Sequence, residues 1–174
     1  MAWLRRALAA TGMIGLFGLV WFAYEFYTPP VAPPCRQVAP EHFTHANAAG
    51  CLVRRGDTVL MVRRRFHGDL DFPGGLQKWQ ETSACAAHRE TWEETGADVV
   101  VGRMIYNVCT GYRMYECTVA DDWEPNARHS PDWAEEVGAQ WVNFSEISPD
   151  EYRYPKVYER MGQVVRGQLG HPVP

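Results

Sequence analysis

The chain has 174 residues, of which 46% are hydrophobic and 22% are charged. This length and apolar content suit one domain with an appendage, and they exclude a disordered chain because enough apolar surface is present to form a core. With a formal net charge of −4, the chain is not expected to carry the basic surface that binds a nucleic-acid backbone. We therefore expect no nucleic acid polymer as a partner.

Residues 1–27 are predicted to form a transmembrane anchor. Eighteen uncharged residues run from Ala7 to Tyr24, and at about 1.5 Å per residue they span roughly 27 Å, close to the hydrocarbon thickness of a bilayer. Arg5 and Arg6 precede this run, so the positive-inside rule predicts a cytoplasmic N-terminus and places the rest of the chain outside the cytoplasm. The alternative orientation has the domain facing the cytosol. A cleaved signal peptide is disfavoured, because bulky aromatic residues occupy the place of a small-residue cleavage site.

The rest of the chain divides into a linker, residues 28–40, and a folded domain, residues 41–174. Four prolines between Thr28 and Pro34 favour a stiff, extended spacer. Two strands are expected at the start of the domain, at 48–55 and 58–64, joined by a hairpin turn at Gly56-Asp57.

A loop at 67–75 then leads to a helix over 82–95, which Thr82 or Ser83 can cap and after which Gly96 suits a left-handed residue. The remaining expected elements are strands at 98–110, 112–119 and 139–144, a loop at 121–132, and a helix at 155–167. This order predicts an α+β fold or an α/β/α sandwich.

The helix at 82–95 carries three glutamates whose spacing indicates a metal site. Glu90 and Glu94 are four residues apart and Glu93 is three from Glu90, so the carboxylates share one helix face. Carboxylates this close repel one another unless a hard cation such as Mg²⁺ binds them together with phosphate oxygens. Arg89 lies four residues before Glu93 and is expected to form an ion pair with it.

Upstream of this helix, Pro73, Gly74 and Gly75 form a turn without bulky side chains, which lets backbone groups approach a metal or a phosphate. Glu81 adds a carboxylate just before the helix. Pyrophosphate hydrolysis needs such parts: metal ions to neutralise the anhydride oxygens and activate a water, and a carboxylate to remove its proton.

The spacing of these residues resembles the signature sequence of the Nudix hydrolases. That signature is a glycine, five residues, a glutamate, seven residues, Arg-Glu, an aliphatic residue, any residue, Glu-Glu, any residue, a glycine and an aliphatic residue. The chain matches its fixed positions with Gly75, Glu81, Arg89, Glu90, Glu93, Glu94 and Gly96. It departs from the signature at Thr91 and at the small Ala97, which affects the packing of the helix more than its chemistry. The resemblance covers roughly residues 48–147 and implies a Nudix-like mixed sheet with a signature helix.

The resemblance also implies roles for individual residues. The implied metal ligands for Mg²⁺ or Mn²⁺ are the backbone oxygen of Gly75 and the carboxylates of Glu90, Glu93 and Glu94. Glu81 would support or bridge this site, and Arg89 would orient it. Glu90, Glu135 and Glu136 remain alternatives for the general base.

The implied activity is cleavage by water of the phosphoric anhydride bond in a nucleoside diphosphate derivative or a related small-molecule diphosphate. The alternatives are a ligand-binding module without turnover and non-hydrolytic diphosphate chemistry on the same fold. Loss of a glutamate from the helix would favour a binding module, and none is lost.

Several weaker patterns allow two interpretations. Arg63, Arg64 and Arg65 end a strand, so that one of them, with Gly74, could bind a substrate phosphate, or they form a solvated charge run. Trp123, Trp133 and Tyr112 suit the core better than substrate stacking, and His88 suits the helix surface better than a metal. The five cysteines are expected to be buried free thiols, with a disulfide between Cys109 and Cys117 as the alternative.

Overall fold

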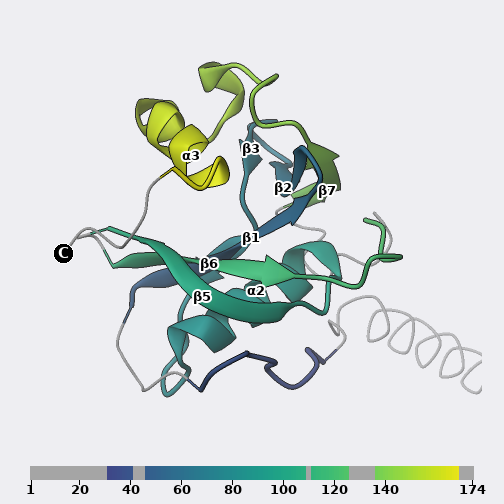
Figure 1. Ribbon diagram of the computed structural model, residues 1–174, viewed down its shortest axis with the longest axis vertical. Helices are drawn as coiled ribbons and strands as arrows, with labels where there is room; N and C mark the ends of the chain where they lie inside the picture. The colour runs from purple at the N-terminus through teal and green to yellow at the C-terminus, as the bar shows by residue number, and fades with distance from the viewer. Residues whose placement is uncertain (1–30, 41–45, 109–110, 126–135, 169–174) are drawn as a thin grey trace, which may run out of the picture. The chain divides into compact units, whose positions relative to one another are not determined.

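The computed structural model describes residues 31–40, 46–108, 111–125 and 136–168 (Figure 1). The chain divides into two units, Met1–Val31 and Ala32–Pro174, and all but one of the described residues belong to the second. The predicted anchor at 1–27 lies outside the described residues. Among the residues that are described, no helix has the length and apolar character needed to cross a bilayer.

The second unit is built on a mixed sheet in the order β3-β2-β1-β6-β5, in which β4 also pairs with β1 and β7 with β2. Its strands are β1 (Ala48–Arg55), β2 (Thr58–Arg64), β3 (Leu70–Asp71), β4 (Gly74–Leu76), β5 (Val100–Asn107), β6 (Tyr112–Thr118) and β7 (Glu136–Val142). Strands β1 and β6 are parallel, whereas every other pairing between these strands is antiparallel. The predicted α+β class is therefore confirmed.

The first two strands have the predicted bounds, and Gly56 in the turn between them has a φ of 56°. Two short strands were not predicted, since β3 and β4 lie in the segment that was expected to be a loop. Strand β7 begins at Glu136 and ends at Val142, whereas the sequence pattern placed it at 139–144.

The signature helix α2 (Ser83–Thr95) begins and ends as its sequence predicts. The Thr82 side chain accepts a hydrogen bond from the backbone N–H of Cys85 at 3.2 Å, and Gly96 adopts a left-handed conformation with φ 74°. Thr91 is fully buried beneath the helix, where its hydroxyl donates to the Ala87 carbonyl at 2.7 Å. This bond satisfies the polar atom that stands in the aliphatic position of the signature.

The second helix, α3 (Tyr158–Val165), follows two short 3₁₀ turns, η1 (Pro149–Glu151) and η2 (Pro155–Val157). The helix predicted at 155–167 therefore begins as a 3₁₀ turn.

Side chains alternate across the strands and form two hydrophobic cores. One core includes Ala84, Ala86 and Ala87 of α2, and the other includes Met161 and Val164 of α3. Figure 1 shows the two helices on opposite sides of the central strands.

Residues 35–38, which were assigned to the linker, contact the folded domain. Cys35 forms a disulfide with Cys85 of α2. Gln37 forms a parallel bridge with Val101, and the backbone N–H of Val38 donates to the Val101 carbonyl at 2.9 Å. This short segment therefore extends the β5 edge of the sheet and is covalently joined to the signature helix.

A second disulfide joins Cys51 of β1 to Cys117 of β6. The expectation of free thiols is wrong for these four cysteines, and Cys117 is not paired with Cys109, which lies outside the described residues. The physical reason is the parallel pairing of β1 with β6. It places Cys51 opposite Tyr115, so that Cys117 is its diagonal neighbour, with 5.6 Å between the two Cα atoms.

The sequence suggested that His88 lies on the helix surface, but this prediction is wrong. Only 1% of His88 is exposed. Its Nε2 atom lies 3.1 Å from Oδ1 of Asp98, whose other carboxylate oxygen forms a salt bridge with Arg36.

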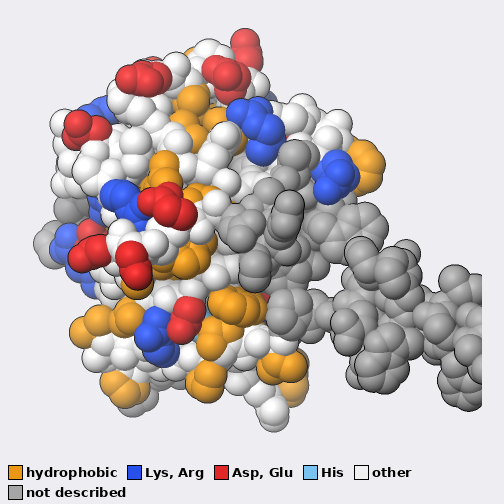
Figure 2. All heavy atoms as spheres, turned by 90° about the vertical axis from the view of Figure 1, so that its right-hand side faces the viewer, with side chains coloured by type: hydrophobic (Ala, Val, Ile, Leu, Met, Phe, Trp, Pro, Cys, Tyr) orange, Lys and Arg blue, Asp and Glu red, His pale blue; other side chains and the backbone are white. Residues whose placement is uncertain are grey.

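On the face of the domain shown in Figure 2, acidic, basic and apolar side chains are interspersed and form no continuous basic surface.

Candidate active site

Arg89 is the centre of the charged cluster on α2. Its Nε and Nη2 atoms donate to the two carboxylate oxygens of Glu81 at 2.9 and 3.0 Å, which is a bidentate pair. Its Nη1 atom donates to Glu90 and to Glu93, both at 2.7 Å, and Nη2 also donates to the Leu76 carbonyl at 2.8 Å. Because its side chain is only 11% exposed, Arg89 fixes three carboxylates and the end of β4 in one arrangement.

The glycine turn before α2 lies against two of the glutamates. The backbone N–H of Gly74 donates to Oε2 of Glu94 at 2.8 Å. A Cβ atom added to Gly75 would lie 2.5 Å from the carboxylate carbon of Glu90, so the bare backbone of Gly75 is in direct contact with that carboxylate. The side chains of Glu90 and Glu94 therefore converge on the turn from the same helix.

Charge and burial act in opposite directions on these carboxylates. Burial raises the pKa of Glu90 above its ordinary value, although the hydrogen bond from Arg89 lowers it. Burial would also raise the pKa of Glu81, but its hydrogen bonds from Arg89 and from the Lys78 backbone outweigh this effect and hold that pKa below its ordinary value. The two groups thus differ in proton affinity although they share Arg89.

The donor set fits a hard divalent cation. The carboxylate of Glu90 lies beside the bare backbone of Gly75 and that of Glu94 lies at the Gly74 N–H, while Glu93 is held by Arg89 on the same helix. Oxygen is the ligand type that Mg²⁺ and Mn²⁺ prefer. In the described residues, no group of three or more His, Cys, Asp or Glu side chains is arranged so that it could hold a metal ion by itself. Mg²⁺ ordinarily binds through one or two carboxylates and completes its shell with waters and substrate phosphates, so an open site of this kind suits it.

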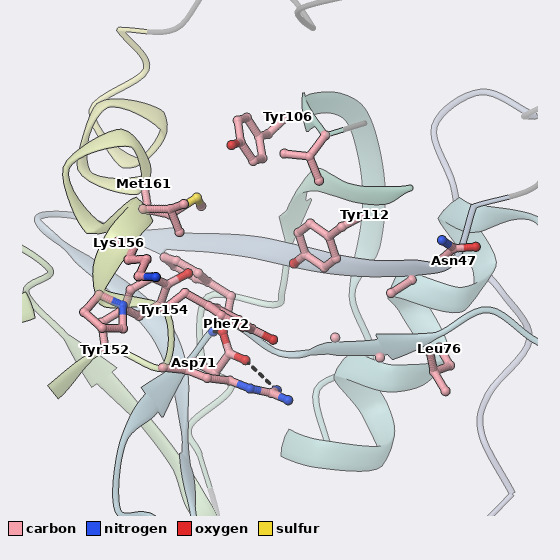
Figure 3. Close-up of a pocket in the computed structure, with 17 residues that line it drawn as sticks. Asn47, Asp71, Phe72, Leu76, Tyr106, Tyr112, Tyr152, Tyr154, Lys156 and Met161 are labelled. Carbon is pink, nitrogen blue, oxygen red and sulfur yellow. Dashed lines mark hydrogen bonds and ion pairs between the residues drawn. The ribbon is translucent and has the colours of Figure 1, made fainter. Parts of the chain in front are cut away.

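The glycine turn also forms one end of a pocket with a volume of about 760 Å³ (Figure 3). The pocket extends from Gly74 and Gly75 to a wall of aromatic side chains: Phe72, Tyr106, Tyr112, Tyr152 and Tyr154. Its volume lies within the range of about 300–1,000 Å³ that is typical of small-molecule sites. The carboxylate cluster and the pocket therefore meet at the same turn.

The pocket contains one charged pair. Nη1 of Arg153 lies 2.9 Å from Oδ2 of Asp71, whose Oδ1 accepts a hydrogen bond from the Phe72 backbone N–H at 2.9 Å. Burial raises the pKa of Asp71 to about 6, although Arg153 lowers it. Sequence reasoning missed this pair and three of the tyrosines; the repeated tyrosines around Arg153 in the segment Tyr152-Arg153-Tyr154 are the signal that could have found them.

Other residues that the sequence singled out lie away from this pocket. Arg63 donates to the Gly68 carbonyl, and Arg64 forms a salt bridge with Asp69, so both are held by the turn between β2 and β3. None of Arg63, Arg64 and Arg65 lines the pocket, and their phosphate role stays a prediction.

Of the remaining candidates, Tyr112 lines the pocket, whereas Trp123 packs edge-on against Trp141 beside the core under α2. Glu135 and Trp133 lie outside the described residues. Glu136 begins β7, where its backbone is paired with Arg64 of β2.

Comparison with known proteins agrees with this geometry. Residues 44–162 match the family described as NUDIX domain. A MutT-like protein from Streptomyces ambofaciens is 32% identical over 119 residues, which are 68% of this chain and 70% of the relative.

Solved structures of Nudix proteins share the fold at lower identity. A NUDIX hydrolase from Nitrosomonas europaea has a TM-score of 0.57 at 20% identity, with 76% of this chain and 77% of that chain covered. A UDP-X diphosphatase has a TM-score of 0.58 at 16% identity, with coverage of 78% and 70%. An ADP-ribose pyrophosphatase from Streptococcus suis has a TM-score of 0.54 at 17% identity, with coverage of 71% and 92%.

The matched region contains the whole signature helix, the glycine turn and the strands that carry them. The structural neighbours share the fold, while the family match and the Streptomyces relative establish the family. The chain therefore belongs to the NUDIX domain family.

Proposed function

We propose that this chain, a Nudix pyrophosphohydrolase, cleaves the phosphoric anhydride bond of a nucleoside diphosphate derivative or a related diphosphate with the aid of Mg²⁺ or Mn²⁺. The observation that carries the proposal is the convergence of the Glu90 and Glu94 side chains on the Gly74–Gly75 turn, where the pocket begins. Glu90, Glu93, Glu94 and the Gly75 backbone oxygen would hold the cation there.

When bound, such a cation neutralises the anhydride oxygens and lowers the pKa of the attacking water. The residues of the chain supply the rest. Arg89 holds the carboxylates of Glu81, Glu90 and Glu93 in fixed positions, so little reorganisation is needed at the moment of reaction. The Gly74 backbone N–H holds Glu94 against the turn in the same way. Glu90, Glu135 and Glu136 are the candidates for the carboxylate that removes the proton of water.

The proposal predicts that Glu93→Gln and Glu94→Gln each lower turnover by at least about 10²-fold, because a metal-assisted step loses a charged ligand. Both variants should stay folded, because the amide keeps an oxygen that can accept the present hydrogen bonds. Glu159→Gln makes the same chemical change on the exposed surface of α3 and serves as the control.

The measurement is hydrolysis of a panel of diphosphates by the full-length protein in detergent, combined with thermal denaturation at increasing Mg²⁺ or Mn²⁺ concentration. A cation that binds only the native cluster should raise the melting temperature, and it should do so less in Glu94→Gln. Unchanged Mg²⁺-dependent turnover in both variants would overturn the proposed site. A parent protein without metal dependence would indicate a binding module.

We also propose that the chain is a single-pass membrane protein whose catalytic domain lies outside the cytoplasm. The uncharged run from Ala7 to Tyr24 and the preceding Arg5 and Arg6 support this orientation. The two disulfides add support from the folded domain, because disulfides persist in oxidising compartments and are rare in the reducing cytosol.

A further inference from the structure

Tyr112 is the first residue of β6, and its ring is directed from that strand into the pocket, as Figure 3 shows. Its backbone lies opposite Ala48 of β1, which is paired on its other side with Leu76 of β4. One strand, β1, therefore separates the start of the Tyr112 side chain from the glycine turn at the start of β4. To reach this turn, the side chain has to pass over β1.

Gly50 of β1 leaves room for this crossing. A Cβ atom added to Gly50 would lie 2.5 Å from the hydroxyl oxygen of Tyr112. The same Cβ atom would lie 2.6 Å from the Pro73 carbonyl oxygen and 3.2 Å from the Gly74 Cα atom. The hydroxyl and the turn thus border one small space that any side chain at Gly50 would fill. The Tyr112 hydroxyl is therefore placed directly beside the turn.

This hydroxyl is available to a ligand. In the part of the chain that the structure describes, no group accepts a hydrogen bond from it. The nearby Pro73 carbonyl already accepts from the Cys51 backbone N–H at 2.9 Å, and the Asp71 carboxylate is paired with Arg153. A hydroxyl in an aromatic wall without a protein partner needs an acceptor from the pocket, because an unmade hydrogen bond is costly.

The surroundings of Tyr112 keep its hydroxyl protonated. Burial, together with the negative charges of Asp71 and Glu94, holds the pKa of Tyr112 well above its ordinary value. A protonated phenol donates readily to an anionic phosphate oxygen, whereas Mg²⁺ prefers carboxylate oxygens. Glu94 contacts the same turn, where it accepts the Gly74 N–H. A diphosphate held at this turn by the carboxylate cluster therefore has a hydrogen-bond donor beside it.

We propose that Tyr112 is a catalytic residue whose hydroxyl donates a hydrogen bond to an oxygen of the diphosphate at the Gly74 turn. Water attacks one phosphorus and gives its proton to the carboxylate base, while the electron pair of the broken anhydride bond passes to the departing phosphate. The phenol keeps its proton throughout, and its hydrogen bond strengthens as negative charge grows on the phosphate. The inference rests on the proposed function for the diphosphate and on the position of the hydroxyl for the contact.

Removal of the hydroxyl alone tests this contact. The full-length protein in detergent with Mg²⁺ is compared with Tyr112→Phe, which keeps the ring. The ligand is methylenediphosphonate, a diphosphate analogue that water does not cleave because carbon replaces the bridging oxygen. We expect Tyr112→Phe to weaken binding of this analogue about tenfold in titration calorimetry. It should lower kcat/KM for a cleaved diphosphate by about 10–100-fold, because a hydrogen bond to a charged group is lost.

Tyr158→Phe is the matched control, because it removes a tyrosine hydroxyl that lies outside the pocket. That hydroxyl lies 3.0 Å from the Phe144 carbonyl oxygen and 2.7 Å from that of Ile147. Tyr158→Phe should lower the melting temperature and leave binding of methylenediphosphonate unchanged. Tyr112→Phe should show the opposite pattern, with a melting temperature within about 2 °C of the parent, because no internal hydrogen bond is lost.

Two results overturn the inference. In the first, Tyr112→Phe binds methylenediphosphonate and cleaves diphosphates as the parent does. In the second, its weaker binding comes with a melting temperature lowered as far as that of Tyr158→Phe, which would make the hydroxyl structural. Tyr112-dependent binding of the analogue by a protein that cleaves no diphosphate would contradict the proposed function and leave the contact standing. Mg²⁺-dependent cleavage that is indifferent to Tyr112→Phe would contradict the inference and leave the proposed function standing.

Discussion

Gly74 and Gly75 are neighbours in the chain, but a side chain at each position would meet different parts of the molecule. A Cβ atom at Gly75 would lie 2.5 Å from Oε2 of Glu90, which is the far end of a flexible side chain. A Cβ atom at Gly74 would lie 2.6 Å from the Gly50 Cα atom and 2.7 Å from the Ala49 carbonyl oxygen, both of which belong to the β1 backbone. A side chain at Gly75 would therefore disturb the carboxylate cluster, whereas a side chain at Gly74 would disturb the pairing of β4 with β1.

We expect Gly75→Ala to keep its fold and lose activity, because the Glu90 side chain can move aside but its carboxylate then leaves the turn. Turnover should fall at least about tenfold while the melting temperature stays near that of the parent. Gly74→Ala should instead lower stability by about 1–3 kcal/mol, since a clash with backbone forces β1 and β4 apart. Thermal denaturation and steady-state hydrolysis of both variants test this pair. Equal loss of stability in both would show that Gly75 is a packing glycine only.

At the residue scale, the sequence predicts contacts within one helix well. The ion pair of Arg89 with Glu93 follows from a separation of four residues, and it is present at 2.7 Å. The pair of Asp71 with Arg153 joins residues that are 82 positions apart. No local pattern indicates such a contact, because it exists only once the segment after η1 lies beside β3, where the Arg153 backbone N–H donates to the Leu70 carbonyl.

At the element scale, predictions succeeded where the signal is local and strong. The bounds of β1, β2 and α2 follow from a turn glycine, a capping threonine and a C-terminal glycine. Strands β3 and β4 have two and three residues, which is too short for a recognisable alternation. The cysteine partners were missed for a different reason. They depend on the parallel pairing of β1 with β6 and on the docking of residues 35–38, neither of which has a sequence signature.

The contacts of residues 35–38 predict that the stable folded domain begins before Cys35. The Cys35–Cys85 disulfide closes a loop with a sequence separation of 50, for which the chain-entropy model gives a stabilisation of roughly 4 kcal/mol. A fragment that starts at Ala32 should therefore unfold at a higher urea concentration than one that starts at Gln37, by about 1 M or more, since the urea dependence is typically about 1–3 kcal/mol per molar. The difference should vanish after reduction with dithiothreitol.

The Cys35→Ser, Cys85→Ser double variant of the longer fragment is the matched control, since it keeps the Arg36 and Val38 contacts but lacks the covalent bond. Without reductant it should unfold close to the fragment that starts at Gln37, because both keep the Cys51–Cys117 disulfide and lack the Cys35–Cys85 bond. If oxidised and reduced parent unfold at the same urea concentration, the disulfide does not contribute to the stability of the domain.

At the scale of the whole molecule, the proposed membrane insertion would decide which substrates the enzyme meets. Arg5 and Arg6 favour a cytoplasmic N-terminus, and the next pair of arginines, Arg54 and Arg55, lies within the folded domain, where the positive-inside rule weakens. The Cys35–Cys85 and Cys51–Cys117 disulfides provide an argument that does not depend on charge, because they need an oxidising compartment to persist.

We therefore expect the protein to remain in the membrane after a carbonate wash, with its C-terminus outside the cytoplasm. An alkaline phosphatase fused to Pro174 should be active and a fluorescent protein fused there should be dark, because the first requires an oxidising compartment and the second folds in the cytosol. Thiol labelling of the denatured protein, before and after reduction, should reveal four additional cysteines only after reduction. A fluorescent C-terminal fusion, together with labelling of these four cysteines already before reduction, would place the domain in the cytosol. That outcome would reverse the orientation and leave the chemistry proposed for the carboxylate cluster unchanged, since no residue of that cluster depends on the membrane.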